Sequence, residues 1–337
     1  MIRRSLIFSL TVVCIIACFI GCMLTGSVDI PPSEVWAALS GNEVARQSWR
    51  FIVVETRLPA VCTALLAGAA LSVAGLLLQT MFGNPLAGPS ILGISSGASL
   101  GVAVVILAFG GVMTLWGQIS VFLAALVGAS LVIVLLLMLS SLLKSPTMLL
   151  IAGILIGYLA MSAISLLNFF APGESVHSYV VWGLGTFNSV TLAMLPSFAT
   201  LTLLMIAASF LFSKPLNALL LGQRYAESSG VNVKSVRNVV LLLSGALTAV
   251  VTAGCGPIGF IGLVVPHIAR LLLRSSNHRV LLPATALFGA AVGELCLLLS
   301  VAPGPEGIIP INAITPIIGV PIIIYIIVRR RSIFYFN

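Results

Sequence analysis

The sequence predicts an all-α integral membrane protein with about ten transmembrane helices, and three observations lead to this fold class. Its 337 residues are 60% hydrophobic and 7% charged, with a mean hydropathy of +1.21, whereas soluble domains carry roughly 25% charged residues. Apolar stretches long enough to cross a bilayer core, roughly 20 residues, recur along the chain. Basic residues gather between alternate stretches, as the positive-inside rule requires.

Ten stretches meet the length criterion. The first is longer than the roughly 7–15 apolar residues of a signal peptide, so we expect a retained helix. The stretches 238–254 and 258–273 could instead form one re-entrant unit, because the second is short and contains Pro266. In chain order the ten are 5–24, 58–82, 88–110, 118–143, 147–170, 189–213, 238–254, 258–273, 280–301 and 308–328.

The charges orient these spans. Both termini are basic, so an even number of spans places both in the cytoplasm, and 13 of the 16 basic residues then face the cytoplasm. Topology thus explains the net charge of +8, and we expect no nucleic-acid partner. The external side holds six of the eight acids. The cytoplasmic basic residues are Arg3, Arg4, Lys144, Lys214, Arg224, Lys234, Arg237, Arg270, Arg274, Arg279, Arg329, Arg330 and Arg331; the external charged residues are Arg46, Arg50, Arg57, Asp29, Glu34, Glu43, Glu55, Glu174 and Glu306.

The polar segments are too short for a soluble domain, so residues 1–337 form a single transmembrane domain with an external segment at 25–57. Within that segment, Pro31, Pro32 and Glu34 predict the start of a short helix, because proline and acidic residues favour the first turn. Small residues at helical spacing predict close helix contacts in lipid. They are Gly68, Ser72, Gly75 and Gln79 on one face, and Gly93, Gly97 and Gly101 on another.

Enzymatic chemistry finds no support in the sequence. None of the three lysines follows a glycine, so there is no GxxxxGK[ST] phosphate loop. The three histidines lack metal-ligand spacing, and the six cysteines form no Cys-x-x-Cys pair and are best explained as small buried hydrophobes. We therefore predict no catalytic residue, no metal site and no cofactor bound by this chain.

Glu294 is the only acidic residue inside the ten stretches. An ionisable group at membrane depth is by default a functional hypothesis, since its burial is costly. The carboxyl could be structural, hydrogen-bonded to a neighbouring helix, or it could couple transport to protons. The second possibility defines an alternative function, a proton-coupled secondary transporter that acts alone.

Four sequence blocks carry a resemblance to a known family. They are "RLPAVCTALLAGAALSVAGLLLQTMFGNPLAGPSILGISSGASLG" (57–101), "GQRYAESSGV" (222–231), "GPIGFIGLVVPHIARLLL" (256–273) and "HRVLLPATALFGAAVGE" (278–294). Together they resemble the membrane permeases of iron-siderophore, haem and vitamin B12 ABC importers, the FecCD-type family with the type II importer fold. The resemblance implies a permease subunit for a metal chelate, iron-siderophore first and haem or cobalamin next, with ATP hydrolysed by a separate subunit.

The uncharged turn "MFGNPLAGPS" (81–90) interrupts two apolar stretches. Irregular backbone at membrane depth is tolerated only where it is buried in protein or lines a water-filled cavity. By resemblance, Asn84 and Leu86 form a cytoplasmic gate with Pro146 and Thr147. The resemblance also assigns the fifth stretch to the translocation path, with Gly153, Gly157, Ser162, Ser165 and Asn168 as candidates.

The inner segment 216–231 carries the next prediction. A short amphipathic stretch closes at Gly230 and a second begins at Val231, so two short helices separated by a glycine would form a cytoplasmic knob; a solvated loop is the alternative. By resemblance these are coupling helices that contact the ATPase, through Leu221, Gly222, Arg224, Ala226, Glu227 and Gly230.

Binding-protein docking departs from the family pattern. Family members often carry arginines where this chain has Ala60 and Leu298, which leaves Arg57 as the matching docking residue, and Asn312 stands where glycine is typical. The block 178–190 resembles a short external helix. The implied partners are a second copy of this permease, two ATP-binding cassette subunits that carry ATP and Mg, a periplasmic or lipid-anchored binding protein, and the metal-chelate substrate. The implied location is the bacterial inner membrane, with several spans.

Overall fold

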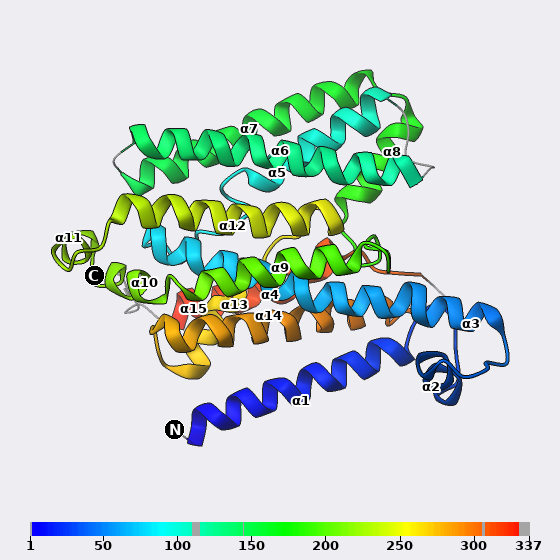
Figure 1. The fold of residues 1–337 in the computed structure, drawn as a ribbon. Helices are drawn as coiled ribbons and strands as arrows, with labels where there is room; N and C mark the ends of the chain where they lie inside the picture. The colour runs from blue at the N-terminus through cyan, green and yellow to red at the C-terminus, as the bar shows by residue number, and fades with distance from the viewer. Residues whose placement is uncertain (1, 110–114, 144, 305–306, 330–337) are drawn as a thin grey trace.

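The computed structural model describes residues 2–109, 115–143, 145–304 and 307–329, and these contain helices joined by turns and loops, with no strand (Figure 1). Two π-helical segments, η1 (Ile52–Arg57) and η2 (Val104–Ala108), continue α3 and α5. The α-helices are α1 (Ile2–Leu24), α2 (Pro32–Ser40), α3 (Gln47–Phe51), α4 (Leu58–Phe82), α5 (Ile94–Ala103), α6 (Leu115–Leu142), α7 (Pro146–Phe170), α8 (Gly173–Gly183), α9 (Leu195–Phe210), α10 (Ser213–Leu219), α11 (Gln223–Ser228), α12 (Val233–Cys255), α13 (Ile261–Leu273), α14 (His278–Val301) and α15 (Ile311–Arg329).

The helices confirm the predicted all-α membrane fold. Within the described part of the chain, six helices are long and apolar enough to cross a membrane, or seven if α9 and α10, bent by 55°, count as one span. Three shorter apolar helices, at 94–108, 261–273 and 311–325, occupy the remaining predicted stretches. The predicted charges at Lys144, Glu306, Arg330 and Arg331 lie outside the described residues.

Helix α4 forms the centre of the bundle and packs against α9, α12, α13 and α14. Of the most apolar 18 residues in its span, 89% are buried, against 28% in α7 and 17% in α1. A Cβ atom at Gly68 would lie 2.1 Å from the Gly289 carbonyl oxygen, and one at Gly75 would lie 1.7 Å from the Gly262 carbonyl oxygen. These glycines let the backbones touch, which confirms the predicted contact face of α4.

A second glycine contact joins α5 to α6. A Cβ atom at Gly101 would lie 2.1 Å from the Ala124 carbonyl oxygen, and one at Gly128 would lie 2.1 Å from that of Gly97. Gly93, which has a positive φ of 74° and precedes α5, lies against Gly153 of α7. The predicted small-residue face at 93–101 therefore packs α5 between α6 and α7.

The bundle has two distinct ends (Figure 1). We call the end with α10 and α11 the α11 end, where α1 also begins, and the opposite end, with α2, α3 and α8, the α8 end. The predicted short helix after Pro31 is α2, which begins with Pro32 and has Glu34 in its first turn. At the α11 end, α4 stops at Gly83, whose φ is 57°, and Asn84 N–H donates to the Gln79 carbonyl.

The segment 216–231 differs in part from its prediction. The structure has two short helices on either side of Gly222, but they are α10 and α11, and no separate short helix begins at Val231 within the described residues. The Asn232 side chain accepts a hydrogen bond from Ser235 N–H and caps α12. Because this cap precedes a long apolar stretch, the helix that starts at Val233 continues through the bundle.

Replacing Gly75 by alanine is expected to destabilise the fold by about 1–3 kcal/mol or more, because the added methyl would overlap the Gly262 backbone. Thermal unfolding of the detergent-solubilised protein measures the effect. Gly173→Ala is the matched control, since a Cβ atom there meets nothing within 4 Å. Equal unfolding temperatures for the two variants would contradict the packing described for α4.

Candidate functional site

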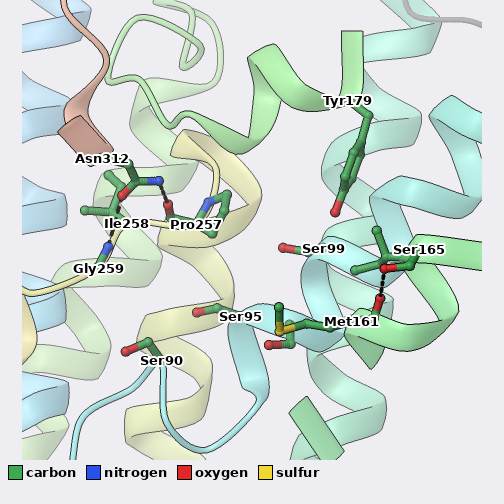
Figure 2. Close-up of a pocket in the computed structure, with 12 residues that line it drawn as sticks. Ser90, Ser95, Ser99, Met161, Ser165, Tyr179, Pro257, Ile258, Gly259 and Asn312 are labelled. Carbon is green, nitrogen blue, oxygen red and sulfur yellow. Dashed lines mark hydrogen bonds between the residues drawn. The ribbon is translucent and has the colours of Figure 1, made fainter. Parts of the chain in front are cut away.

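A cavity of about 430 Å³ lies between α5, α7 and α8, at the turn that precedes α13 (Figure 2). This volume falls in the range of small-molecule sites, roughly 300–1,000 Å³. It combines side chains from segments far apart in sequence, which only the folded bundle brings together. The lining residues are Ser90, Ser95, Ser96, Ser99, Met161, Ile164, Ser165, Tyr179, Pro257, Ile258, Gly259 and Asn312.

Helical spacing aims the serines into the cavity. Ser95 and Ser99 are four residues apart on α5, so both project from one face, and Met161 and Ser165 repeat this spacing on α7. The Ser95 hydroxyl lies 3.4 Å from the Thr252 hydroxyl of α12. The Ser165 hydroxyl donates to the Met161 carbonyl at 3.0 Å, which satisfies its proton within α7.

The cavity wall is polar but uncharged, since the described residues that line it include no Asp, Glu, Lys or Arg. Tyr179 directs its hydroxyl toward Ser99 (Figure 2). Burial raises the pKa of Tyr179 above its ordinary value, and a hydrogen bond with Ser99 partly opposes this, so the phenol stays protonated. Such a wall offers hydroxyl and amide groups to a polar surface without a fixed charge.

Asn312 holds one side of the cavity in place. Its side-chain amide donates to the Pro257 carbonyl at 2.5 Å and to the Gly183 carbonyl at 3.1 Å, and its Oδ1 accepts from Gly259 N–H at 3.3 Å. The next residue in that turn, Phe260, has a φ of 65°, a strained value for a bulky residue. One side chain therefore ties this strained turn to the end of α8.

The predicted path residues divide into two groups. Ser165 lines the cavity, whereas Gly153 and Gly157 are buried against Leu92 and Gly93 and bring α7 close to the turn before α5. Ser162 is exposed on α7 outside the cavity lining, and Asn168 is half-buried. The glycines thus shape the cavity by setting the position of α7.

The predicted gate residues lie in two turns. Asn84 Oδ1 accepts from Leu86 N–H at 2.9 Å, which stiffens the first turn, and the Leu86 side chain is exposed. In the second turn, Pro146 is half-buried as the first residue of α7, and Thr147 is exposed. The first turn follows α4, which ends near the start of α14. The second turn follows α6, which ends near the start of α12.

The six predicted coupling residues lie in and around α11. Ala226 is buried, and Gly222 and Gly230 have positive φ values of 102° and 83° at the two ends of the helix. The other three predicted residues, Leu221, Arg224 and Glu227, are exposed. The helix therefore presents most of these residues on the outer surface of the α11 end.

The predicted docking residue, Arg57, lies inside the chain, with 8% of its surface exposed. Its guanidinium donates to the carbonyls of Met23 at 2.8 Å, Leu24 at 3.3 Å and Val28 at 2.5 Å. These bonds close the last turn of α1 and the connection to α2. The geometry favours this structural role over contact with a separate protein.

Residues 13–329 match the FecCD transport family. The chain belongs to this family. Among its relatives, the vitamin B12 import system permease protein BtuC of Klebsiella pneumoniae is 32% identical over 98% of this chain and 95% of that protein. The hemin transport system permease protein HmuU of Yersinia pestis is 33% identical over 98% of this chain and 97% of that protein.

A solved structure described as an inward-facing conformation of a metal-chelate type ABC transporter shares the fold, with a TM-score of 0.84. It is 28% identical and covers 96% of this chain and 99% of that one. The FecCD chain is thus a multi-pass membrane permease of a family of ABC importers for metal chelates, vitamin B12 and haem, with the type II importer architecture.

Sequence reasoning missed most of the cavity. The serines at 90–99 stood inside a quoted block of the FecCD resemblance, and their helical spacing was the available signal. Tyr179 and the turn at 257–259 carried no such signal, because their place depends on how distant helices pack. Asn312 was noted only as a departure from glycine, and the structure shows what its side chain does.

Asn312→Ala is expected to destabilise the protein by about 1–3 kcal/mol, because it leaves the partly buried turn at 257–259 without its hydrogen-bond partners. The thermal unfolding temperature in detergent reports this loss. Asn42→Ala serves as the control, since Asn42 is exposed and its recorded hydrogen bond uses only its backbone N–H. A drop no larger than that of the control would contradict the anchoring role.

Proposed function

We propose that this chain forms half of a homodimeric permease that imports a metal chelate through an ABC transporter of the bacterial inner membrane. Two copies enclose the translocation path, two separate ATP-binding cassette subunits bind ATP and Mg and hydrolyse the ATP, and a periplasmic or lipid-anchored protein delivers the substrate. The chain binds no cofactor of its own and carries out no covalent chemistry.

The uncharged, hydroxyl-lined cavity beside α7 carries this proposal. A path for a large polar cargo must accept the cargo and release it, and fixed charges would hold a charged chelate too tightly. The face of α7 outside the bundle exposes Tyr158 and Ser162 beside large apolar side chains. Polar groups on a lipid-facing surface are unfavourable, so a second copy packed on α7 accounts for them and completes the path.

The two ends of the bundle fit the two kinds of partner. At the α11 end, Leu221, Arg224 and Glu227 are exposed, and we propose that they contact the ATPase. This end, where α1 begins, would then face the cytoplasm, in keeping with the expected cytoplasmic location of both termini. At the α8 end, Arg57 is buried, so the exposed Arg46 and Arg50 are the better candidates to pair with acidic groups of the binding protein.

The relatives narrow the substrate class. BtuC is named for vitamin B12 and HmuU for hemin, and both cargoes are bulky metal chelates. Serine, tyrosine and asparagine side chains suit the many oxygen atoms of an iron-siderophore, which we place first, with haem and cobalamin next.

Reconstitution in liposomes with and without a cognate ATPase subunit tests the function. We expect uptake of a ferric siderophore, hemin or cobalamin only when the ATPase, ATP, Mg and the binding protein are all present. A non-hydrolysable ATP analogue provides the control and should abolish uptake. Uptake by this chain alone, driven by a pH gradient, would contradict the proposal.

A proton-coupled transporter that acts alone is the second candidate, and one observation favours it. Glu294 is fully buried in α14, and neither carboxylate oxygen has a hydrogen-bond partner among the described residues. The Cys22 thiol of α1 donates to the Glu294 backbone carbonyl at 3.5 Å, so α1 packs on α14 at this residue. Glu294 is not among the residues that line the serine-lined cavity.

Glu294→Gln separates the two candidate functions. Glutamine keeps the shape of the side chain and cannot release a proton, so ATP-driven uptake should stay within about twofold of the unmodified protein if Glu294 is structural. Initial uptake rates at pH 6 and pH 8 in the reconstituted system measure this. Loss of uptake at both pH values, with the fold intact by thermal unfolding, would contradict a structural role for Glu294 and show that transport needs its ionisable carboxyl.

A further inference from the structure

A chain of hydrogen bonds, buried at its α4 end, joins α10 to the end of α4. The Asn217 Oδ1 of α10 accepts from the backbone N–H of His278 at 2.8 Å and lies 2.9 Å from His278 Nδ1. The other ring nitrogen, Nε2, lies 2.8 Å from the Thr80 hydroxyl of α4. His278 and Thr80 are 1% and 3% exposed, so water does not compete for the contact between them, whereas Asn217 is half-buried.

The orientation of each group in this chain is fixed by its neighbours. The Asn217 Nδ2 donates to Asn277 Oδ1 at 2.9 Å, so Asn217 Oδ1 is the acceptor that faces His278. His278 Nδ1–H therefore donates to it, which leaves Nε2 as an acceptor for the Thr80 hydroxyl. The same hydroxyl also lies 3.0 Å from the Leu76 carbonyl of its own helix, so Nε2 and this carbonyl share its one proton. Asn217 and Thr80 thus pair with the two ring nitrogens of His278. Displacement of α10 would leave the buried His278 Nδ1–H unpaired unless His278 and Thr80 moved with α10.

A second set of bonds joins α12 to the end of α6. The Arg237 guanidinium donates to the carbonyl of Ser140, in the last turn of α6, and, at 3.4 Å, to that of Leu143, which directly follows α6. The Ser140 hydroxyl donates to Asn238 Oδ1 at 2.8 Å. Two consecutive residues of α12 thus hold the end of α6.

These two sets of bonds flank the same segment and reach the two predicted gate turns. The segment 213–232, with α10 and α11, contains Asn217 and ends shortly before Arg237 in the chain. Thr80 lies just before the turn that contains Asn84 and Leu86, and the α6 end leads to Pro146 and Thr147. A cavity of about 170 Å³ lies between the α4 end and the α10–α11 connection, so apolar packing there is incomplete and polar groups carry the contact.

We propose that Asn217, His278 and Thr80 on one side, and Arg237 on the other, are positioning residues that transmit movement of the segment 213–232 to the two gate turns. This inference rests on the proposed function, because the movement originates in the ATPase bound at α11. Hydrogen bonds then link the segment 213–232 to both predicted gate turns. A single displacement of the segment therefore moves both turns at once.

The test measures uptake per ATP hydrolysed in the reconstituted transporter with its ATPase and binding protein. Thr80→Val keeps the shape of the side chain and removes the hydroxyl that pairs with His278. We expect the ratio of uptake to hydrolysis to fall about fivefold, the change in population that corresponds to loss of one net hydrogen bond. Thr80→Ser keeps the hydroxyl and should restore the ratio.

The same substitution at Thr200 is the matched control, because Thr200 is exposed on α9 and its hydroxyl donates only within the helix, to the Pro196 carbonyl. Arg237→Met tests the second set of bonds and should lower the ratio as well, with Arg4→Met, exposed at the same end, as its control. A variant that only weakened the fold would lower uptake and ATPase association together. The ratio of uptake to ATP hydrolysis would then stay unchanged.

Two results overturn the inference and are distinguishable from failure of the proposed function. If the unmodified protein shows no ATP-driven uptake, the proposed function fails before any variant is compared. If the unmodified protein transports and Thr80→Val and Arg237→Met both keep its ratio of uptake to hydrolysis, the function stands and the transmission role of these residues is wrong.

Discussion

Backbone contact through glycine is the interaction on which the rest of this structure depends. In lipid the hydrophobic effect does not drive helices together, so close packing must hold them. Gly68 and Gly75 of α4 meet the carbonyl oxygens of Gly289 and Gly262, and this fixes α4 between α13 and α14. Gly97, Gly101 and Gly128 do the same for α5 and α6. These two sets of glycine contacts set the positions of the cavity and of the two predicted gate turns.

These glycine contacts explain how an almost uncharged chain can carry a defined polar site. Burying a hydroxyl or an amide is unfavourable unless its hydrogen bonds are satisfied. Asn312 satisfies three groups of the turn at 257–259 and of α8, and the serines of α5 share the wall with Tyr179. Elsewhere, charged side chains form internal hydrogen bonds. Arg57 donates to a backbone carbonyl at the end of α1, and Arg237 donates to one at the end of α6.

The sequence predicted what depends on local pattern. Apolar length predicted the spans, and small-residue spacing predicted the contact faces around Gly75 and Gly101. It could not predict that Arg57 turns inward, because that depends on where the end of α1 lies relative to α4. Nor could it bring Asn312 beside Pro257, since the pairing follows from how α15 enters the bundle. The prediction of a second short helix at Val231 was wrong, because the Asn232 cap starts the long helix α12 instead.

We propose that movement of the segment 213–232 opens and closes the turn at Asn84–Leu86. The most direct measurement is the distance between spin labels on Leu86→Cys in the two copies of the reconstituted transporter, with the exposed Cys14 replaced by alanine. Pulsed electron paramagnetic resonance would record this distance without nucleotide and with ATP and vanadate. The account predicts two distinct distance distributions for the two conditions. A single distribution that nucleotide leaves unchanged would contradict it.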